Sequence, residues 1–117
     1  MIRVNEDLFD FKGDQRLYNG RPFTGIAFYE YPNQVLKREL YYKDGLEEGV
    51  CREWHPNGQL KREWFAVRGR ATGRVSEWHP NGKLQSVSEY HEGDEVMRDE
   101  WNAAGDLILS RRMASNA

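Results

Sequence analysis

Long hydrophobic runs, a second cysteine and an excess of charge of one sign are all missing from this sequence. Because Cys51 is the only cysteine, no internal disulfide can form, and the residue says little about the cellular compartment. Seventeen basic and 19 acidic residues give a formal net charge of −2, which favours neither a nucleic acid nor a membrane surface as partner. No stretch is long enough to span a bilayer, and the first residues, MIRVNEDLFD, lack the apolar run of a signal peptide. We therefore expect a cytoplasmic protein.

Hydrophobic residues are scarce as well, at 38% of the 117 residues, whereas 31% are charged. This balance leaves little material for a large globular core. Aromatic residues nevertheless make up 13%, which is too many for a disordered chain. The composition therefore predicts one thin domain in which large rings bury most of the apolar surface.

An internal repeat with a period of 24 residues is the main positive feature. The segment EWHPNGQLKREW at Glu53–Trp64 returns as EWHPNGKLQ at Glu77–Gln85. A first copy, YEYPNQVLKREL, precedes these two, and a degenerate copy that is one residue short follows at 100–107. Such a period is typical of repeat proteins, in which each copy folds against its neighbours.

The His-Pro-Asn-Gly segment predicts the turn of a β-hairpin. Its order of residues suits a type I turn followed by a left-handed glycine, which gives a three-residue loop. A two-residue Asn-Gly loop is the alternative, but it would place Pro56 in a hydrogen-bonded pair although proline has no N–H. The three-residue loop places Trp54 opposite Leu60 and Glu53 opposite Lys61.

This register sorts the side chains onto two faces of a sheet. One face is expected to carry the apolar core of the repeats, and the other to be solvated, with charged cross-strand pairs and His55. Arg52 would lie opposite Arg62 on the apolar face, which is an unfavourable pair of like charges. The expected repeat core consists of Leu36, Trp54, Leu60, Trp78, Leu84, Trp101 and Leu107.

Glycines at positions 45, 69 and 93 mark a second turn in each repeat, and no stretch has a sustained helical period. The expected fold is therefore all-β: a single-layer antiparallel meander of stacked β-hairpins, built from about four 24-residue repeats in one domain, 1–117. We expect residues 1–16 to cap the first edge. The repeats would occupy 17–41, 42–65, 66–90 and 91–113, followed by a tail at 114–117.

The sequence resembles the bacterial variant of the MORN (membrane occupation and recognition nexus) repeat. Pro-Phe-Thr-Gly at Pro22–Gly25 is followed by copies of Gly-x3-Glu-Trp-His-Pro-Asn-Gly-x-Leu, and the turn glycines, the aromatic residue and the leucine recur together. The resemblance implies β-hairpins that stack into an extended sheet. Many small bacterial members of the family resemble the antitoxins or immunity proteins of toxin–antitoxin and polymorphic toxin systems. The resemblance thus implies a protein that neutralises a toxin made by the same cell, and it brings no catalytic motif.

The paired histidines and glutamates of the two central copies raise the question of a metal site. Equivalent residues one repeat apart are separated by two strand spacings, roughly 10 Å, whereas zinc holds its nitrogen ligands at about 2.1 Å. Catalysis would need a nucleophile with a base, or paired carboxylates, in a pocket, and Cys51 has no such signature nearby. We therefore expect no metal, no other cofactor and no enzymatic activity.

A cognate protein toxin, encoded next to this protein, is the expected partner, and neither a nucleic acid nor a membrane is expected. Basic and acidic residues alternate along the chain, whereas a lipid-binding surface would cluster the basic ones. A MORN-type scaffold or a membrane-associated protein-interaction module is the alternative function. Exposed rings in a single-layer sheet are natural contact anchors. The expected partner-binding residues are Tyr29, Tyr31 and Phe65, on the face opposite the tryptophans, with Glu53, Lys61, Glu63 and Glu77 for charge complementarity.

Overall fold

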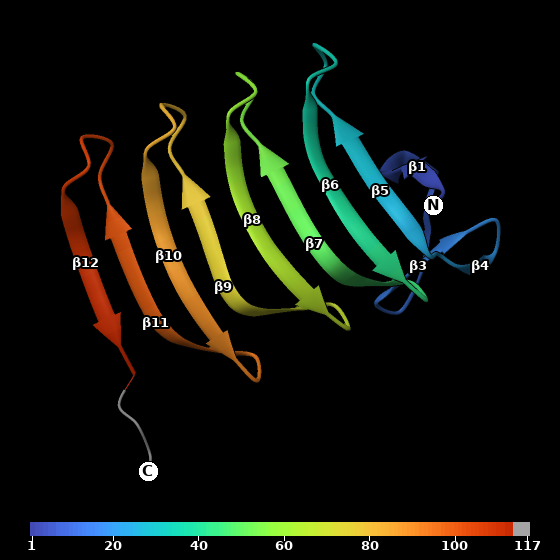
Figure 1. The fold of residues 1–117 in the computed structure, drawn as a ribbon. Coiled ribbons are helices and arrows are strands. Elements are labelled where there is room, and N and C mark those ends of the chain that lie inside the picture. Colours follow the sequence, from blue (N-terminus) through green and yellow to red (C-terminus); the bar gives the residue numbers. More distant parts are fainter. Residues whose placement is uncertain (114–117) are drawn as a thin grey trace.

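The computed structural model describes residues 1–113 and consists almost entirely of β-strands (Figure 1). Its main sheet has nine strands in the order β1-β5-β6-β7-β8-β9-β10-β11-β12, so from β5 onward every strand lies beside its neighbour in the chain. All pairings from β5 to β12 are antiparallel. The predicted meander of stacked hairpins is confirmed. Its strands are β5 (Gly25–Glu30), β6 (Leu36–Lys43), β7 (Leu46–Trp54), β8 (Leu60–Val67), β9 (Arg70–Trp78), β10 (Leu84–His91), β11 (Asp94–Trp101) and β12 (Leu107–Arg112).

The molecule is thin rather than compact. Its extents are 46 × 43 × 21 Å, and its radius of gyration is 16.1 Å, compared with about 13 Å for a compact domain of this length. Strands β7, β9 and β11 bend strongly near their starts, which curves the sheet (Figure 1). The curved sheet has two broad faces, and within residues 1–113 its lateral strands are β1 (Arg3–Asn5) and β12.

The long loops have the predicted three-residue geometry. In the second repeat the N–H of His55 donates to the carbonyl of Gln59 at 2.8 Å, and the N–H of Gly58 donates back to the carbonyl of His55 at 2.9 Å. Gly58 has a φ of 87°, in the left-handed region that glycine adopts without strain. Pro56 lies inside the loop, where its missing N–H costs nothing.

Each long hairpin contains a β-bulge, and the bulge changes the register expected beyond the loop. Trp54 lies opposite Leu60 as predicted, but Glu53 lies opposite Arg62, so Lys61 is the extra residue. The predicted pairs of Glu53 with Lys61 and of Arg52 with Arg62 are therefore wrong. Because the register moves by one residue, Arg52 lies opposite Glu63 instead, and the unfavourable arginine pair disappears.

The second turn of each repeat is a two-residue loop. In Asp44-Gly45, Arg68-Gly69 and Glu92-Gly93 both residues have positive φ, as in the type I′ turns that match the twist of antiparallel strands. Gly49 follows the first of these turns by four residues. It lies inside β7 with a φ of 117°, where its main chain passes close to Tyr41. That position lies in the irregular stretch at which β7 bends.

The N-terminal segment forms a separate small sheet beside the first repeat. Strand β1 (Arg3–Asn5) adds to the main sheet parallel to β5, and the 3-10 turn η1 (Glu6–Leu8) follows it. The boundary expected after residue 16 falls within β3. The small antiparallel sheet consists of β2 (Asp10–Lys12), β3 (Gln15–Tyr18) and β4 (Arg21–Pro22).

The apolar core lies at this N-terminal end and not along the expected row of recurring tryptophans and leucines. Six of the seven expected repeat-core residues are half-buried, and the seventh, Leu107, is 57% exposed. Phe9 and Phe23 of the N-terminal segment stack at 4.7 Å between ring centroids and cover the face of the first strands. The expected tail at 114–117 lies outside the described residues. The buried core cluster consists of Val4, Phe9, Phe23, Ala27, Leu40, Tyr42, Cys51 and Ala66, with Tyr18 and Trp64 packed against it.

Candidate protein-binding surfaces

The side chain that precedes each Pro-Asn turn connects that turn to the next repeat. The hydroxyl of Tyr31 donates to the carbonyl of Trp54 at 2.7 Å. The Nε2 of His55 lies 2.7 Å from the carbonyl of Trp78, and that of His79 lies 2.8 Å from the next equivalent carbonyl. Because a carbonyl can only accept, each imidazole Nε2–H donates. The histidines are half-buried links between repeats, so the expectation that His55 projects into solvent is wrong.

The turn asparagines form a second set of links. The Nδ2 of Asn57 donates to the carbonyl of Pro80 at 2.8 Å, and the Nδ2 of Asn81 donates to the carbonyl of Ala103 at 2.9 Å. The repeated His-Pro-Asn-Gly segment therefore has a structural role, which is to hold consecutive turns in register. Within residues 1–113, no group of three or more His, Cys, Asp or Glu side chains is arranged to hold a metal ion.

One face of the main sheet carries a row of alternating charges, which we call the Glu53 face. Along neighbouring strands, Arg38 pairs with Glu53, Glu53 with Arg62, and Arg62 with Glu77. The row continues through Ser86. Paired residues lie on the same side of a sheet, so opposite charges stand next to one another in three successive cross-strand pairs.

Arg62 is the most constrained member of this row. Its guanidinium lies over the Trp64 ring at 4.5 Å from the centroid, and its Nε is buried with no hydrogen-bond partner among the described residues. A lysine at both 53 and 77 would place like charges on either side of this group. Charge reversal on the Glu53 face would therefore disturb the sheet itself as well as any partner.

The opposite side of the sheet, which we call the Phe65 face, carries exposed apolar side chains. Phe65 pairs with Val50, and its side chain is 48% exposed, while Val67 on the same face is 42% exposed. Val50 and Trp54 belong to the regular part of β7, four residues apart, so Phe65 shares the face of Trp54. The expectation that Phe65 lies opposite the tryptophans is wrong, because the bulge moves β8 by one residue.

Ion pairs surround the exposed ring of Phe65. Arg52 contacts Glu63 at 2.7 Å, and Arg74 contacts Glu89 at 3.1 Å. A shallow cleft of about 230 Å³ lies between these charges and the ring. An apolar centre with a charged rim is the usual composition of a protein-binding patch.

The predicted partner-binding residues do not form one surface. Tyr29, Glu53 and Glu77 are on the Glu53 face, whereas Glu63 and Phe65 are on the Phe65 face. Lys61 occupies the bulge between strands, and Tyr31 lies in a turn with its hydroxyl already bonded.

Sequence reasoning missed several residues that shape these surfaces. Val50 and Val67 flank Phe65, and Trp64 supports Arg62. The three-residue loop specifies the pairing of Trp54 with Leu60, but the extra residue, Lys61, lies beyond the loop, so the loop alone did not predict the change of face.

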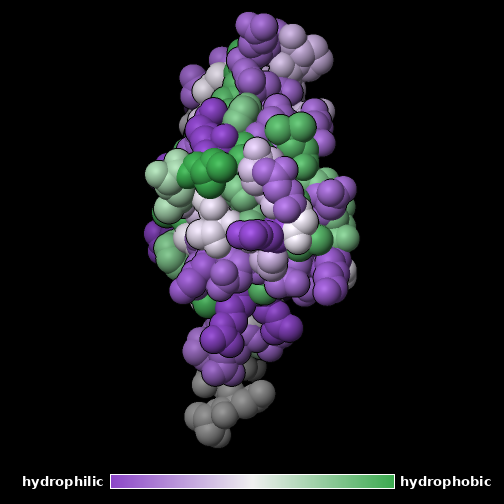
Figure 2. All heavy atoms as spheres, turned by 90° about the vertical axis from the view of Figure 1, so that its right-hand side faces the viewer, coloured by the Kyte–Doolittle hydropathy of each residue, from purple (hydrophilic) through white to green (hydrophobic). Residues whose placement is uncertain are grey.

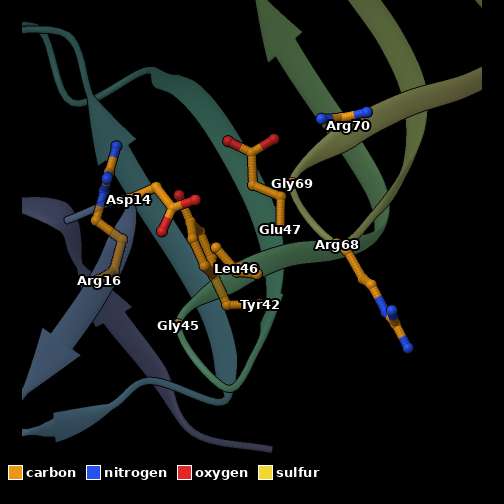
Figure 3. A pocket seen from close by; sticks show the side chains of 9 residues that line it. All are labelled: Asp14, Arg16, Tyr42, Gly45, Leu46, Glu47, Arg68, Gly69 and Arg70. Carbon is orange, nitrogen blue, oxygen red and sulfur yellow. The ribbon is translucent and has the colours of Figure 1, made fainter. Parts of the chain in front are cut away.

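A separate cleft of about 210 Å³ lies at the other end of the strands, between the loop after β2 and two short turns (Figure 3). Asp14, Tyr42 and Glu47 line it, and the Arg68 side chain points away from it. Burial, with smaller contributions from nearby Glu6 and Glu53, raises the pKa of Glu47 against the opposing effect of Arg16 and Arg62. Burial, followed by the charge of Glu47, raises the pKa of Tyr42 to about 12. The cleft is smaller than a typical small-molecule pocket.

Cys51 is fully buried in the apolar core, in the same cluster as Tyr42, which lines this cleft. Burial raises the pKa of its thiol to about 12, so the thiolate that acts as nucleophile or metal ligand is not formed near neutral pH. The side chain behaves as a small apolar core residue.

The fold and the linked turns define a protein whose main sheet consists of repeated β-hairpins. Residues 47–66 and 71–92 match the family model described as MORN repeat variant. The matched segments contain the hairpins β7–β8 and β9–β10, and the pairs β5–β6 and β11–β12 repeat the same architecture outside them. The match supports a MORN-variant repeat protein, and such repeats suggest a protein-interaction scaffold. No curated protein and no solved structure matches the chain.

Proposed function

We propose that this protein is a non-catalytic immunity protein of bacterial origin, which acts in the cytoplasm by binding and neutralising a cognate toxin encoded next to it. The observation that supports the proposal is the Phe65 face. It combines an exposed ring and an exposed valine, Val67, with a rim of ion pairs on a hydrogen-bonded sheet. A rigid surface loses little conformational entropy on binding, so more of the contact energy appears as affinity.

The alternative is a MORN-type scaffold, including one associated with a membrane. The only helical element in residues 1–113 is the three-residue turn η1, so no helix there is long enough to cross a bilayer. Basic residues on both faces have acidic partners, such as Glu6 for Arg38 on the Glu53 face and Glu63 for Arg52 on the Phe65 face. Attraction to anionic lipid depends instead on clusters of unpaired basic residues. This pairing favours a protein partner over a lipid surface.

The test is to co-express the protein with the product of the adjacent gene, and to measure rescue of growth and co-purification. We expect rescue by the native chain. Phe65→Ser should weaken binding by about 30-fold, because truncating a central aromatic contact costs 2 kcal/mol or more.

Tyr29→Ser is the matched control, since it removes a ring of similar size from the opposite face. Thermal melts must first show that both variants fold. Loss of binding in Tyr29→Ser alone would move the site to the Glu53 face. No binding of the adjacent product by the native chain would reject the immunity function and leave the scaffold.

A further inference from the structure

The lateral edge formed by β12 is open within the described residues. Strand β12 pairs with β11 only, and all six of its residues are exposed. Ile108 is 61% exposed and Leu109 is 36% exposed. Exposed edge strands present unpaired N–H and C=O groups, and proteins normally cover or disrupt them.

The backbone groups that point outward can be identified from the pairing with β11. The N–H of Met113 donates to the carbonyl of Val96 at 2.9 Å. In an antiparallel pair, alternate residues direct both of their backbone groups to the same neighbour. Arg111 therefore faces β11 as Met113 does, while Ser110 and Arg112 direct their N–H and C=O groups away from the sheet.

The same edge is occupied in every preceding repeat. The outer edge of β8 pairs with β9 through Arg62–Glu77 and Glu63–Ser76, and the outer edge of β10 pairs with β11 through Ser86–Glu100 and Val87–Asp99. Leu109 and Ser110 are the equivalent positions of β12. The backbone conformation of this edge is thus the one that accepts an antiparallel strand elsewhere in the molecule.

A further repeat of the same kind would lack its links at the last turn. Asn102 replaces the linking histidine, and its Oδ1 accepts from the N–H groups of Ala104 and Asp106 within its own turn, at 3.0 Å each. Ala104 replaces the linking asparagine, and its side chain has no hydrogen-bond donor. The segment that fits this edge is therefore a single strand bound through its main chain, without a stacked turn.

A second copy of the chain fits the edge poorly. Antiparallel self-pairing through the outward groups, with Ser110 of one copy opposite Arg112 of the other, would place the two Arg111 side chains directly opposite each other, where like charges are unfavourable. Within one chain these two arginines are already balanced, by Glu95 at 2.8 Å and Asp99 at 2.8 Å. A foreign strand without a basic residue opposite Arg111 avoids this repulsion.

We propose that β12 is a docking edge, to which a protein partner adds one antiparallel strand by pairing with the outward backbone of Ser110 and Arg112. The added strand carries no lysine or arginine opposite Arg111. The inference rests on the proposed function only for the identity of the partner, since the edge itself is a property of the fold.

The first experiment uses a synthetic peptide with the sequence of residues 70–78, RATGRVSEW, which is the strand that pairs with the equivalent edge of β8. At about 1 mM peptide, a concentration that detects weak binding, the backbone amide NMR signals of Ser110 and Arg112 should shift. The signals of Leu109 and Arg111, whose amides face β11, should shift less. No shift along β12 overturns the proposal.

Ser110→Pro removes an outward N–H and leaves the bonds to β11 in place. We expect it to weaken peptide binding by about tenfold, the effect of losing a main-chain hydrogen bond. Ser110→Ala is the matched control, because both variants lose the hydroxyl that donates to Asp99 at 2.7 Å. If Ser110→Pro does not fold, Arg112→Pro alters the other outward N–H. Equal binding by the proline and alanine variants overturns the proposal.

The same variants separate this inference from the proposed function. If the adjacent gene product binds the native chain and Ser110→Ala but not Ser110→Pro, the edge is its docking site. If it binds all three equally, the edge is not its site. If it binds none of the three proteins, the immunity function is rejected, and the peptide experiment still tests whether β12 is a docking edge. A concentration-dependent dimer that Ser110→Pro abolishes would replace the foreign strand with a second copy and overturn the proposal.

Discussion

His55 and His79 show how one side chain can look catalytic and act structurally. Each imidazole donates to the main-chain carbonyl of a tryptophan in the next repeat, at 2.7 and 2.8 Å. The carbonyl that accepts this bond would lose its partner if the ring were removed. At this level, recurrence of a polar residue in a repeat indicates a contact between repeats.

We predict that His55→Ala destabilises the protein by about 1 kcal/mol, the usual net value of one hydrogen bond in a partly buried site. Urea melts of the native and variant chains measure the difference. His91→Ala is the control, because the His91 side chain is 77% exposed and its nearest ionic neighbour, Glu92, is 3.9 Å away. Equal stability of the two variants would contradict a structural role for His55.

Glu47 should make the protein less stable as the pH rises. Because the pKa of Glu47 is raised in the folded state, the folded chain keeps this proton to higher pH than the unfolded chain. Stability from the neutral carboxyl is complete below the ordinary pKa of glutamate and is lost as the pH rises through the raised value. Glu47→Gln should therefore be more stable than the native chain at pH 7, with the difference shrinking toward pH 4.

Denaturant melts between pH 4 and pH 7 measure this difference, and the other carboxylates cancel in the comparison. Glu92→Gln is the control, since the Glu92 side chain is 86% exposed. A Glu47→Gln variant whose advantage grows as the pH falls would show that the sign is wrong.

At the level of single elements, the bulge in each hairpin decides which residues share a face. One extra residue on β8 turns Arg62 toward Glu53 and places Phe65 with Trp54. The alternating row on the Glu53 face and the apolar patch on the Phe65 face both follow from this single insertion. If the bulge is ignored, the residues of β8 beyond it are assigned to the wrong face, because successive side chains of a strand point to opposite faces.

Gly25 holds β1 against the main sheet. Its φ is 151°, and a Cβ there would lie 2.5 Å from the main-chain oxygen of Ile2 and 2.9 Å from the Phe23 ring. Gly25→Ala should destabilise the protein by more than about 1 kcal/mol, since both the backbone and β1 would have to move. Gly58→Ala is the comparison, because that turn glycine has a positive φ but no atom near its missing Cβ.

Thermal and urea melts would rank the two alanine variants. A Gly25→Ala chain as stable as Gly58→Ala would mean that β1 contributes little to the fold. In that case the parallel pairing of β1 with β5 would be dispensable.

At the level of the whole molecule, the packing is uneven from one end to the other. The N-terminal segment covers one face of the first strands and encloses the aromatic cluster, and every residue of β12 is exposed. Seen from the N-terminal end, the molecule is narrow, and hydrophobic side chains lie among hydrophilic ones on the surface (Figure 2). The described residues thus have one well-packed end and one end that is held mainly by main-chain pairing and ion pairs.

This asymmetry predicts a gradient of local stability. Native-state hydrogen exchange should be slowest for the amides of β6 and β7, which contain Leu40, Tyr42 and Cys51, and fastest for β12. The exchange of individual amides can be followed by NMR. Uniform exchange from β6 to β12 would instead indicate one cooperative unit, and would contradict an end that opens independently.

Local sequence determined the hairpins, because their information lies within a few residues. Pro-Asn-Gly specifies the three-residue loop, Asp44-Gly45 and its equivalents specify the tight turns, and the 24-residue period specifies the stacking. These features predicted an all-β meander correctly. The same local pattern did not reveal that the N-terminal residues form a second sheet, since that depends on contacts between distant segments.

Tertiary structure alone decided where the core lies and which residues share a surface. The tryptophans are large side chains that recur with the repeat, and they were therefore expected to form the core. Burial, however, requires material on both sides of a sheet. The N-terminal segment supplies that material over Leu40, Tyr42 and Cys51. For the same reason Trp54 stays half-buried, and the predicted contact residues separate onto two faces. A repeat determines the fold of each hairpin, whereas the non-repeated N-terminal segment determines which of the first strands are covered.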